Sequence, residues 1–347
     1  MPVRKRKKTQ KMLRDRVKEA ALIIKQGGLV AFPTETVYGL GGDALNEKTV
    51  ENIYAAKGRP GDNPLIIHVS KADDFWRLCS DAPEYAKYLI DAFWPGPLTL
   101  VVNKHPDLPK WLGVHPSMES STIAVRMPSH PIAISLINES GCFIAAPSAN
   151  KSGKPSPTSA EHVRDDFSRL DISILDGGST TVGLESTVVD ITGEKPIVLR
   201  PGSITLEDIM RVINKQVLSG IALSDDNPRS PGTKYKHYAP IAPLTILVGN
   251  HADIAAYIAE EAKIPSMGAL VMPSTFELLP EQVLSDSKTI VSGPQVELFA
   301  RNLYANFRAF DNLDVNRIFA ESTPFDGIGY AVMDRMQKAA EGRIIIV

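Results

Sequence analysis

Residues 28–44 read GLVAFPTETVYGLGGDA, an apolar run followed at once by a polar turn. The apolar residues 29–32 have the length and side chains of a buried strand. Thr34, Glu35 and Thr36 follow where that strand ends, and the cationic turn Lys57-Gly58-Arg59-Pro60 comes less than thirty residues later. We interpret the polar strand end and the cationic turn as parts of a site that handles phosphate.

Further apolar runs of strand length follow and alternate with helical patterns. The runs lie at residues 29–32, 98–102, 122–125, 143–146, 172–175, 186–189 and 197–199. Such alternation predicts one large α/β sheet. The link over residues 190–196 is too short for the helix that a parallel crossover needs, so the strands that it joins should be antiparallel. We therefore expect a large, mixed and twisted sheet.

Two helices in this first part of the chain can be predicted from their ends. Asn46 as N-cap, apolar residues at helical spacing and Gly58 at the end predict a helix over residues 47–57. A second helix is predicted over residues 205–220. It precedes a stretch of proline and polar residues at 224–232 that is typical of a linker.

The pattern restarts beyond Pro240. Strands are expected at residues 244–248, 269–272 and 344–347, and helices from residue 253 and over residues 294–311. This alternation predicts a smaller, doubly wound, Rossmann-like α/β domain. We expect a catalytic domain over residues 14–206, a helix and linker over 207–240, and the second domain over 241–347.

The composition is that of a soluble globular protein. Of 347 residues, 43% are hydrophobic and 22% charged, and no apolar run approaches the roughly 18 residues that a membrane span needs. Two cysteines, Cys79 and Cys142, are too few for a disulfide framework and favour the reducing cytoplasm. The net charge of −2 gives no general attraction for nucleic acid, but basic residues 4–8 form a cationic arm, either a solvated tail or a weak tRNA contact.

Two cations at the end of the first helix are candidates for binding a polyphosphate. Lys57 and Arg59 stand two residues apart across the helix end, so both can converge on one ligand, with the arginine as a bidentate fork. The alternative is that a helix C-terminus simply favours cations through its dipole. Gly58 and Gly61 beside them favour a ligand, because backbone that approaches an anion closely needs glycine.

Other polar or charged residues stand where predicted strands begin or end. They are Arg126, Ser148, Asn150, Ser156, Ser186 and Arg200. The ends of strands are where α/β proteins commonly bind ligands, although a carboxylate partner at the surface would also explain Arg126. A plain turn is the alternative for Ser148 and Asn150. Taken together, the residues predict a site assembled from many strands.

Familiar motifs for nucleotides, metals and hydrolysis are absent from the sequence. Neither G-x-x-x-x-G-K-[ST] nor G-x-S-x-G occurs. The nearest match to the dinucleotide fingerprint, Gly39-x-Gly41-x-x-Ala44, lacks an acid about 20 residues later at the end of a second strand. His68 has no second histidine or cysteine at metal spacing, so we predict no protein-built metal site and expect a core or rim histidine.

Six stretches of the first domain resemble those of the YrdC-like family. They are residues 32–40, Lys57-Gly58-Arg59, Asn63-Pro64-Leu65, residues 93–99, Arg126-Met127-Pro128 and Ser148-Ala149-Asn150. Residues 230–240 resemble the linker of the two-domain long form, with Thr233 where that family usually has methionine. The resemblance covers the whole first domain and implies its fold.

The resemblance also implies an activity, that of an L-threonylcarbamoyladenylate synthase. This nucleotidyltransferase joins L-threonine, bicarbonate and ATP into threonylcarbamoyl-AMP and pyrophosphate for the threonylcarbamoyladenosine modification of tRNA. Mg²⁺ would accompany the ATP, and a downstream threonylcarbamoyl-transferase complex would take the product. Such chemistry needs charge neutralisation and positioning more than a proton-transfer residue, which agrees with the missing catalytic triad.

Roles for individual residues follow from the same resemblance. The L-threonine pocket would comprise Thr34, Thr36, His68, Arg126, Ala146 and Ser186. ATP would be bound by Lys57, Arg59, Asn63, Thr122, Ser148, Asn150, Ser156, Arg200 and Tyr235, with Lys57 and Arg59 as the catalytic pair. The linker, with Tyr235 in it, would act as a lid.

Two other functions are alternatives to this one. A structured-RNA-binding module without its own chemistry would use the same cations to meet phosphates. A carbamoyl-transfer enzyme of hydrogenase maturation would share the fold, but it resembles a longer chain with cysteine-rich zinc modules, and two cysteines exclude that layout.

Overall fold

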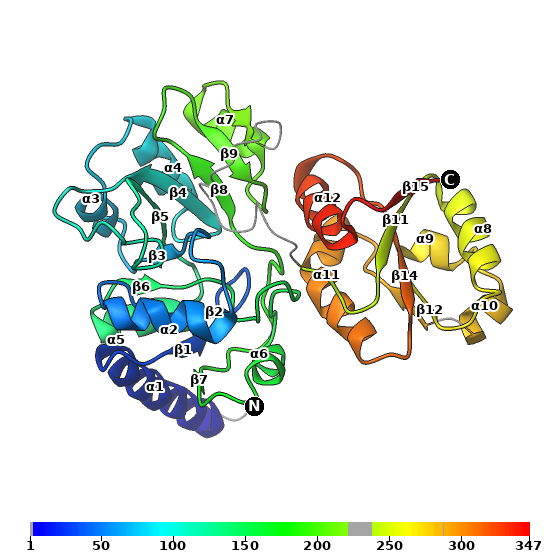
Figure 1. Cartoon of the computed structure of the whole chain (residues 1–347), viewed down its shortest axis with the longest axis horizontal. Coiled ribbons are helices and arrows are strands. Elements are labelled where there is room, and N and C mark those ends of the chain that lie inside the picture. The colour runs from blue at the N-terminus through cyan, green and yellow to red at the C-terminus, as the bar shows by residue number, and fades with distance from the viewer. Residues whose placement is uncertain (1–2, 221–237, 287) are drawn as a thin grey trace. The chain divides into compact units, whose positions relative to one another are not determined.

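The computed structural model describes residues 3–220, 238–286 and 288–347. The chain forms two compact units, of which the first holds most residues up to 220 and the second holds residues from 238 onwards. Two short segments, Gly153–Ser156 and Val182–Leu184, group with the second unit. Figure 1 labels the elements of both.

The first unit is built on a ten-stranded sheet with the order β10-β9-β8-β4-β5-β3-β6-β2-β1-β7. Its strands are β1 Val30–Phe32, β2 Gly39–Asp43, β3 Ile66–His68, β4 Leu98–Asn103, β5 Thr122–Arg126, β6 Ile144–Ala145, β7 Ser173–Ile174, β8 Thr187–Asp190, β9 Ile197–Arg200 and β10 Leu218–Ser219. Neighbours β4 and β5 are antiparallel, whereas β3 and β5 are parallel. The expected mixed sheet is confirmed, including the antiparallel pair β8 and β9.

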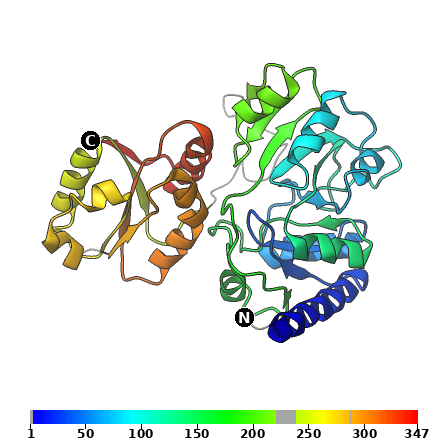
Figure 2. The same cartoon turned by 180° about the vertical axis from the view of Figure 1, so that it is seen from behind.

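Helices cover this sheet and form its apolar cores. They are α1 Val3–Lys25, α2 Glu47–Lys57, α3 Asp74–Leu78, α4 Tyr85–Phe93, α5 Pro131–Ser140, α6 Ala160–Asp166 and α7 Leu206–Ile213. The prediction for α2 is confirmed residue for residue, with the Asn46 side chain capping its start and Gly58 in the left-handed conformation at its end. Helices α1 and α5 lie side by side, as Figures 1 and 2 show, and share an apolar cluster.

The predicted helix over residues 205–220 is wrong in its second half. Helix α7 ends at Ile213 because Asn214 adopts a left-handed conformation at φ 49°. The next residues turn back, and β10 then pairs in parallel with β9. Helix α1 was not predicted at all, although Val17, Ala20 and Ile24 follow the helical period and are buried.

The glycine-rich stretch that resembles a dinucleotide fingerprint forms strand β2, antiparallel to both β1 and β6. Its glycines are there for close packing. A Cβ added to Gly42 would lie 2.2 Å from the Thr49 side chain of α2, and one added to Gly41 would lie 2.6 Å from Ile144 of β6. The stretch is thus a strand and not the strand-to-helix turn of a dinucleotide fingerprint, in agreement with the prediction from the missing acid.

The second unit is a five-stranded parallel sheet with the order β13-β12-β14-β11-β15. Its elements are β11 Leu244–Val248, α8 His251–Glu261, β12 Met267–Val271, α9 Pro273–Phe276, α10 Glu281–Asp286, β13 Lys288–Val291, α11 Val296–Asp311, β14 Arg317–Glu321, α12 Gly327–Ala340 and β15 Ile344–Ile346. The expected doubly wound domain is confirmed. Of the expected lid over residues 224–240, residues 224–237 lie outside the described residues. The lid and the domain limits stay predictions.

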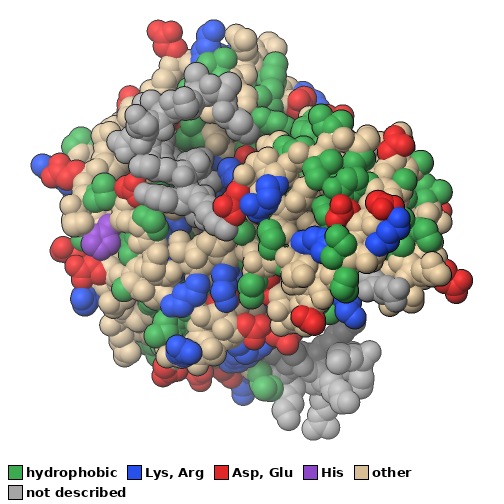
Figure 3. All heavy atoms as spheres, turned by 45° about the vertical axis from the view of Figure 1, so that its right-hand side comes forward, with side chains coloured by type: hydrophobic (Ala, Val, Ile, Leu, Met, Phe, Trp, Pro, Cys, Tyr) green, Lys and Arg blue, Asp and Glu red, His purple; other side chains and the backbone are tan. Residues whose placement is uncertain are grey.

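Among the residues that the structure describes, no helix is long and apolar enough to cross a membrane. On the face shown in Figure 3, basic and acidic side chains are intermixed in both units.

Candidate functional site

The centre of the candidate site is Arg126, the last residue of β5. The residue is 3% exposed, so a permanently charged guanidinium is buried. Nη2 donates to Glu35 Oε1 at 2.7 Å, Nη1 donates to Thr36 Oγ1 at 3.0 Å, and Nε donates to the Gly96 carbonyl at 3.2 Å. The arginine is therefore held by acceptors from two different segments.

The loop that follows β1 is folded by its own threonine. Thr34 Oγ1 donates to the Val37 carbonyl at 2.6 Å and accepts from the backbone N–H of Thr36 and Val37. The two threonine hydroxyl oxygens lie 2.8 Å apart. Thr34 thus closes the turn, and Thr36 presents its hydroxyl to Arg126.

His68 lies beside Arg126 because β3 and β5 are paired with these two residues in register. It is 4% exposed, and its Nδ1 donates to the Ile66 carbonyl at 3.1 Å, which leaves Nε2 as an acceptor. Burial, and then the charge of Arg126, lowers the pKa of His68 to about 3. The ring is neutral at physiological pH. The Ala146 N–H donates to the same carbonyl, so the expected pocket residues His68 and Ala146 are neighbours.

The neutral state of His68 predicts an acid-sensitive contribution to stability. Because its pKa of about 3 in the folded protein lies below the ordinary 6.5, the unfolded chain takes up the proton first as the pH falls. The stabilisation is complete above that ordinary value, and it should decrease by about 1.4 kcal/mol per pH unit below it. Urea denaturation of the wild type and His68→Gln at about pH 7, 6 and 5 tests this. The difference in free energy of unfolding between the two proteins should shrink towards acid; a constant difference would contradict the prediction.

Ser186 and Arg200 form a second buried group, at the neighbouring strands β8 and β9. Arg200 donates through Nε and Nη2 to the Ser186 carbonyl at 3.1 and 3.0 Å, and Nη2 also lies 3.1 Å from Ser186 Oγ. Ser186 Oγ is 2.7 Å from Thr99 Oγ1 of β4. The structure thus brings together one residue expected for threonine and one expected for ATP.

Lys57 reaches from the last turn of α2 into the loop after β6. Its Nζ donates to the carbonyls of Ser148 and Asn150, each at 2.5 Å, and the residue is 3% exposed. Ser148 Oγ in turn donates to Asn150 Oδ1. Three residues expected at the ATP site therefore form one cluster.

Arg59 bonds to a different loop. Its Nη2 donates to Asn63 Oδ1 at 2.6 Å and to the Pro64 carbonyl at 2.8 Å, while Nε donates to the Asn63 carbonyl. Asn63 is 2% exposed, and its Nδ2 has no hydrogen-bond partner among the residues that the structure describes. A buried amide donor without a partner is costly and suits a place that a ligand completes. The expected convergence of Lys57 and Arg59 on one polyphosphate stays a prediction.

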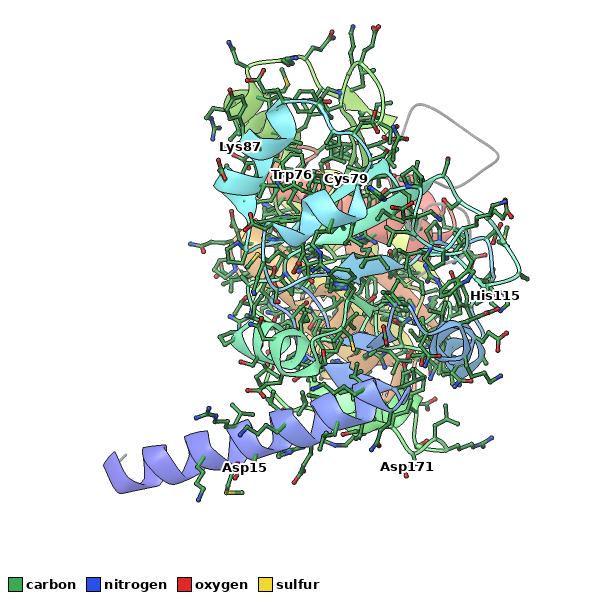
Figure 4. All side chains as sticks on the ribbon, turned by 90° about the vertical axis from the view of Figure 1, so that its left-hand side faces the viewer. Asp15, Trp76, Cys79, Lys87, His115 and Asp171 are labelled. Atoms are coloured by element: carbon green, nitrogen blue, oxygen red, sulfur yellow. The ribbon has the colours of Figure 1, made fainter. Side chains whose placement is uncertain are left out.

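Two hollows have residues of the loop over 58–64 in their walls. One, of about 570 Å³, is lined by Arg59, Gly61 and His115, and Figure 4 shows His115 beside α2. The other, of about 590 Å³, includes Asp62 and Thr122. Thr122 thus lines the second cavity.

Two further expected ATP residues lie elsewhere or cannot be described. Ser156 is fully buried and belongs to one of the short segments that group with the second unit. Tyr235 lies outside the described residues.

Sequence reasoning missed Glu35 as a site residue, although the stretch containing it was singled out. Glu35 is 7% exposed, and its Oε2 accepts from the Ser129 N–H at 3.1 Å. Burial alone would raise the pKa of Glu35, but the charge and hydrogen bond of Arg126 and the backbone donors lower it below its ordinary value. The carboxylate partner considered as an alternative for Arg126 therefore exists, inside the site rather than at the surface. A lone acid between two threonines carried no signal of that pairing.

The described residues include no group of three or more His, Cys, Asp or Glu side chains placed to hold a metal ion.

Comparison with known families decides what kind of protein carries this site. The family model Sua5_yciO_yrdC, described as Telomere recombination, matches residues 22–202, more than half of the chain. The chain belongs to this Sua5/YciO/YrdC family. A second model, described as Threonylcarbamoyl-AMP synthase, C-terminal domain, matches residues 204–341.

Relatives in the Sua5/YciO/YrdC family match nearly the full length. Threonylcarbamoyl-AMP synthase of Bacillus subtilis is 46% identical over 331 residues, which are 95% of this chain and 94% of the relative. The protein of that name from Pyrococcus abyssi is 44% identical, with 96% and 98% covered. The crystal structure of P. abyssi Sua5 complexed with L-threonine matches with a TM-score of 0.85 and 43% identity, covering 95% of this chain and 96% of that one.

Proposed function

We propose that the protein is an L-threonylcarbamoyladenylate synthase, which converts L-threonine, bicarbonate and ATP into threonylcarbamoyl-AMP and pyrophosphate. The observation that carries the proposal is the buried Arg126 with an uncharged histidine beside it, an arrangement suited to the carboxylate of an amino acid. Relatives of that name along the full length of the chain support it. A similar chain, P. abyssi Sua5, was solved with L-threonine.

In this proposal Arg126 binds the carboxylate of L-threonine. Thr34, Thr36, the Ala146 backbone and Ser186 line the pocket. Neutral His68 accepts a hydrogen bond at Nε2, which it could not do as an imidazolium. The threonine nitrogen forms a bond to CO₂ derived from bicarbonate and releases a proton, which gives a carbamate.

The carbamate oxygen then attacks the α-phosphorus of ATP, and the bond from that phosphorus to pyrophosphate breaks. The residues around the nucleotide are to neutralise and position the phosphates rather than transfer protons. We assign this role to Lys57, Arg59, Asn63, Thr122, Ser148, Asn150, Ser156 and Arg200. The donor Nδ2 of Asn63 supports a ligand beside Arg59.

Mg²⁺ enters the proposal only as the ion that accompanies ATP. The described residues offer no acidic cluster for a protein-built metal site. An ion held mainly by phosphate oxygens and water needs none. When bound, it would neutralise phosphate charge.

The first test measures pyrophosphate release and detects the adenylate by mass. Purified protein is incubated with ATP, magnesium, L-threonine and bicarbonate, and each is omitted in turn. We expect release to require both L-threonine and bicarbonate. Verified ATP binding without release would favour the alternative, an RNA-binding module without its own chemistry.

We also propose a weak tRNA contact at α1, alongside transfer of the product to a downstream threonylcarbamoyl-transferase complex. Lys11, Arg14 and Lys18 are exposed and follow one another at helical spacing, and the sequence continues that basic character towards residues 4–8. Helix α1 runs past the body of the first unit in Figure 4. Phosphate contacts from such a stripe would be independent of base sequence.

Reversing three charges tests this contact. The triple variant Lys11→Glu, Arg14→Glu, Lys18→Glu should lower tRNA affinity about tenfold and flatten its salt dependence, because each lost phosphate contact removes counterion release. Filter binding between low and moderate salt gives both quantities. The rate of adenylate synthesis should equal that of the wild type, which serves as the control for correct folding. Unchanged affinity and salt dependence would place any tRNA contact elsewhere.

A further inference from the structure

We infer that Glu35 is a positioning residue, which fixes the direction and charge state of Arg126 for recognition of the substrate's carboxylate. The inference rests on the proposed function and adds a residue to it. Three observations carry it: the anchoring of Glu35, the N–H groups left on Arg126, and the charge of the buried group.

Glu35 is anchored at both carboxylate oxygens and at its backbone. Oε1 accepts from Arg126 Nη2 and Oε2 accepts from the Ser129 N–H, just beyond the end of β5. The Glu35 carbonyl accepts from the Thr181 N–H at 3.1 Å. The residue therefore joins the loop after β1, the end of β5 and the segment before residue 182. Displacing Glu35 from Arg126 would also break its contact with Ser129, so the anchoring opposes displacement by a ligand.

The hydrogen bonds of Arg126 leave a defined pair of donors. A guanidinium has five N–H groups. Nε, Nη1 and Nη2 each use one, on Gly96, Thr36 and Glu35 respectively. Within the part of the chain that the structure describes, one N–H on each of Nη1 and Nη2 has no acceptor, and an arginine can donate such N–H groups to a carboxylate. The contact with Glu35 thus holds the guanidinium in place while two of its N–H groups remain for a second carboxylate.

The charges within the pocket also favour a positioning role for Glu35. Glu35 and Arg126 are both almost fully buried and together carry no net charge, and His68 beside them is neutral. A buried arginine without its acid would be an uncompensated charge, which is strongly unfavourable. Glu35 therefore stabilises the charged receptor before the substrate is present.

A competing role would give the opposite result. If Glu35 occupied the carboxylate site and had to be displaced, removing its charge would strengthen the binding of L-threonine. The anchoring by Ser129 and Thr181 favours positioning instead. The two roles are separated by the sign of the change in the KM for L-threonine.

The test is Glu35→Gln in the full-length protein, with steady-state pyrophosphate release as the assay. We expect the KM for L-threonine to rise at least tenfold, with the KM for ATP within twofold of the wild type. A lower KM for L-threonine, or equal losses for both substrates, would overturn the inference. If the wild type itself shows no threonine-dependent release, the proposed function fails, and that outcome is recognised without any variant.

Three further variants test whether the change in KM reflects a folding defect and whether it depends on Arg126. Glu321→Gln removes a carboxylate of the same type, 2% exposed, from the second unit, and should leave the KM for L-threonine unchanged. In an Arg126→Lys background, Glu35→Gln should raise the KM for L-threonine by less than about a further twofold, because the guanidinium that Glu35 positions is gone. Should Glu35→Gln fail to fold, Glu35→Asp keeps the charge but is too short for both contacts. It should still raise the KM for L-threonine severalfold, and an unchanged value would overturn the inference.

Discussion

Replacing Arg126 with alanine is expected to raise the KM for L-threonine about a hundredfold or more, because losing the charged partner of a buried substrate carboxylate costs several kcal/mol of binding free energy. The variant loses the donors assigned to the carboxylate and leaves Glu35 as an unpaired buried charge. The affinity for ATP should change little. Initial rates at varied L-threonine and varied ATP, together with the melting temperature, give the three quantities.

A matched control uses an arginine of the same unit outside the site. Arg77 is exposed and pairs with Asp74 in α3, so Arg77→Ala should leave both KM values unchanged. An equal loss of L-threonine and ATP use in Arg126→Ala would assign the arginine to the phosphates instead.

Replacing Lys57 with methionine should lower kcat/KM for ATP by about two to three orders of magnitude, the range seen when one preorganised donor to a developing charge is removed. Methionine keeps most of the aliphatic stem but loses the charge. It also leaves the carbonyls of Ser148 and Asn150 without this donor, so the loop that carries two more expected ATP residues should loosen.

Lys48→Met is the control within the same helix. Lys48 is exposed and forms a surface ion pair with Glu51, which contributes little to stability. Its kcat/KM for ATP should equal that of the wild type. If the Lys57→Met variant bound ATP and catalysed the reaction at the wild-type rate, the role of Lys57 would be structural, as a hydrogen-bond donor to the loop carbonyls.

Local signals in the sequence were enough for much of the fold. Helix α2 could be predicted to the residue because Asn46 and Gly58 terminate it by short-range chemistry. The antiparallel pair β8 and β9 followed from the length of one link. The end of α7 was missed because the left-handed Asn214 is a weaker stop than glycine, and edge strand β10 depends on a partner distant in sequence.

In the candidate site, too, contacts between residues distant in sequence could not be predicted. The residues that meet at Arg126 come from positions about 90 apart in the chain, and only strand pairing brings them together. Sequence reasoning placed Thr36 and Arg126 in one pocket through a resemblance, but an ion pair such as that of Glu35 leaves no local pattern. The partnering of Lys57 with backbone carbonyls is equally invisible, since carbonyls have no sequence signature.

The two sheets differ in how their edges are protected. The large sheet ends in β10 and β7, each of two residues, so little unpaired backbone is open to another chain. The small sheet ends on one side in β15, whose Ile346 is 84% exposed and Ile344 42% exposed. A bare apolar edge is a template for strand addition. A charged residue in place of Ile346 would therefore be a natural safeguard against self-association during crystallisation or storage.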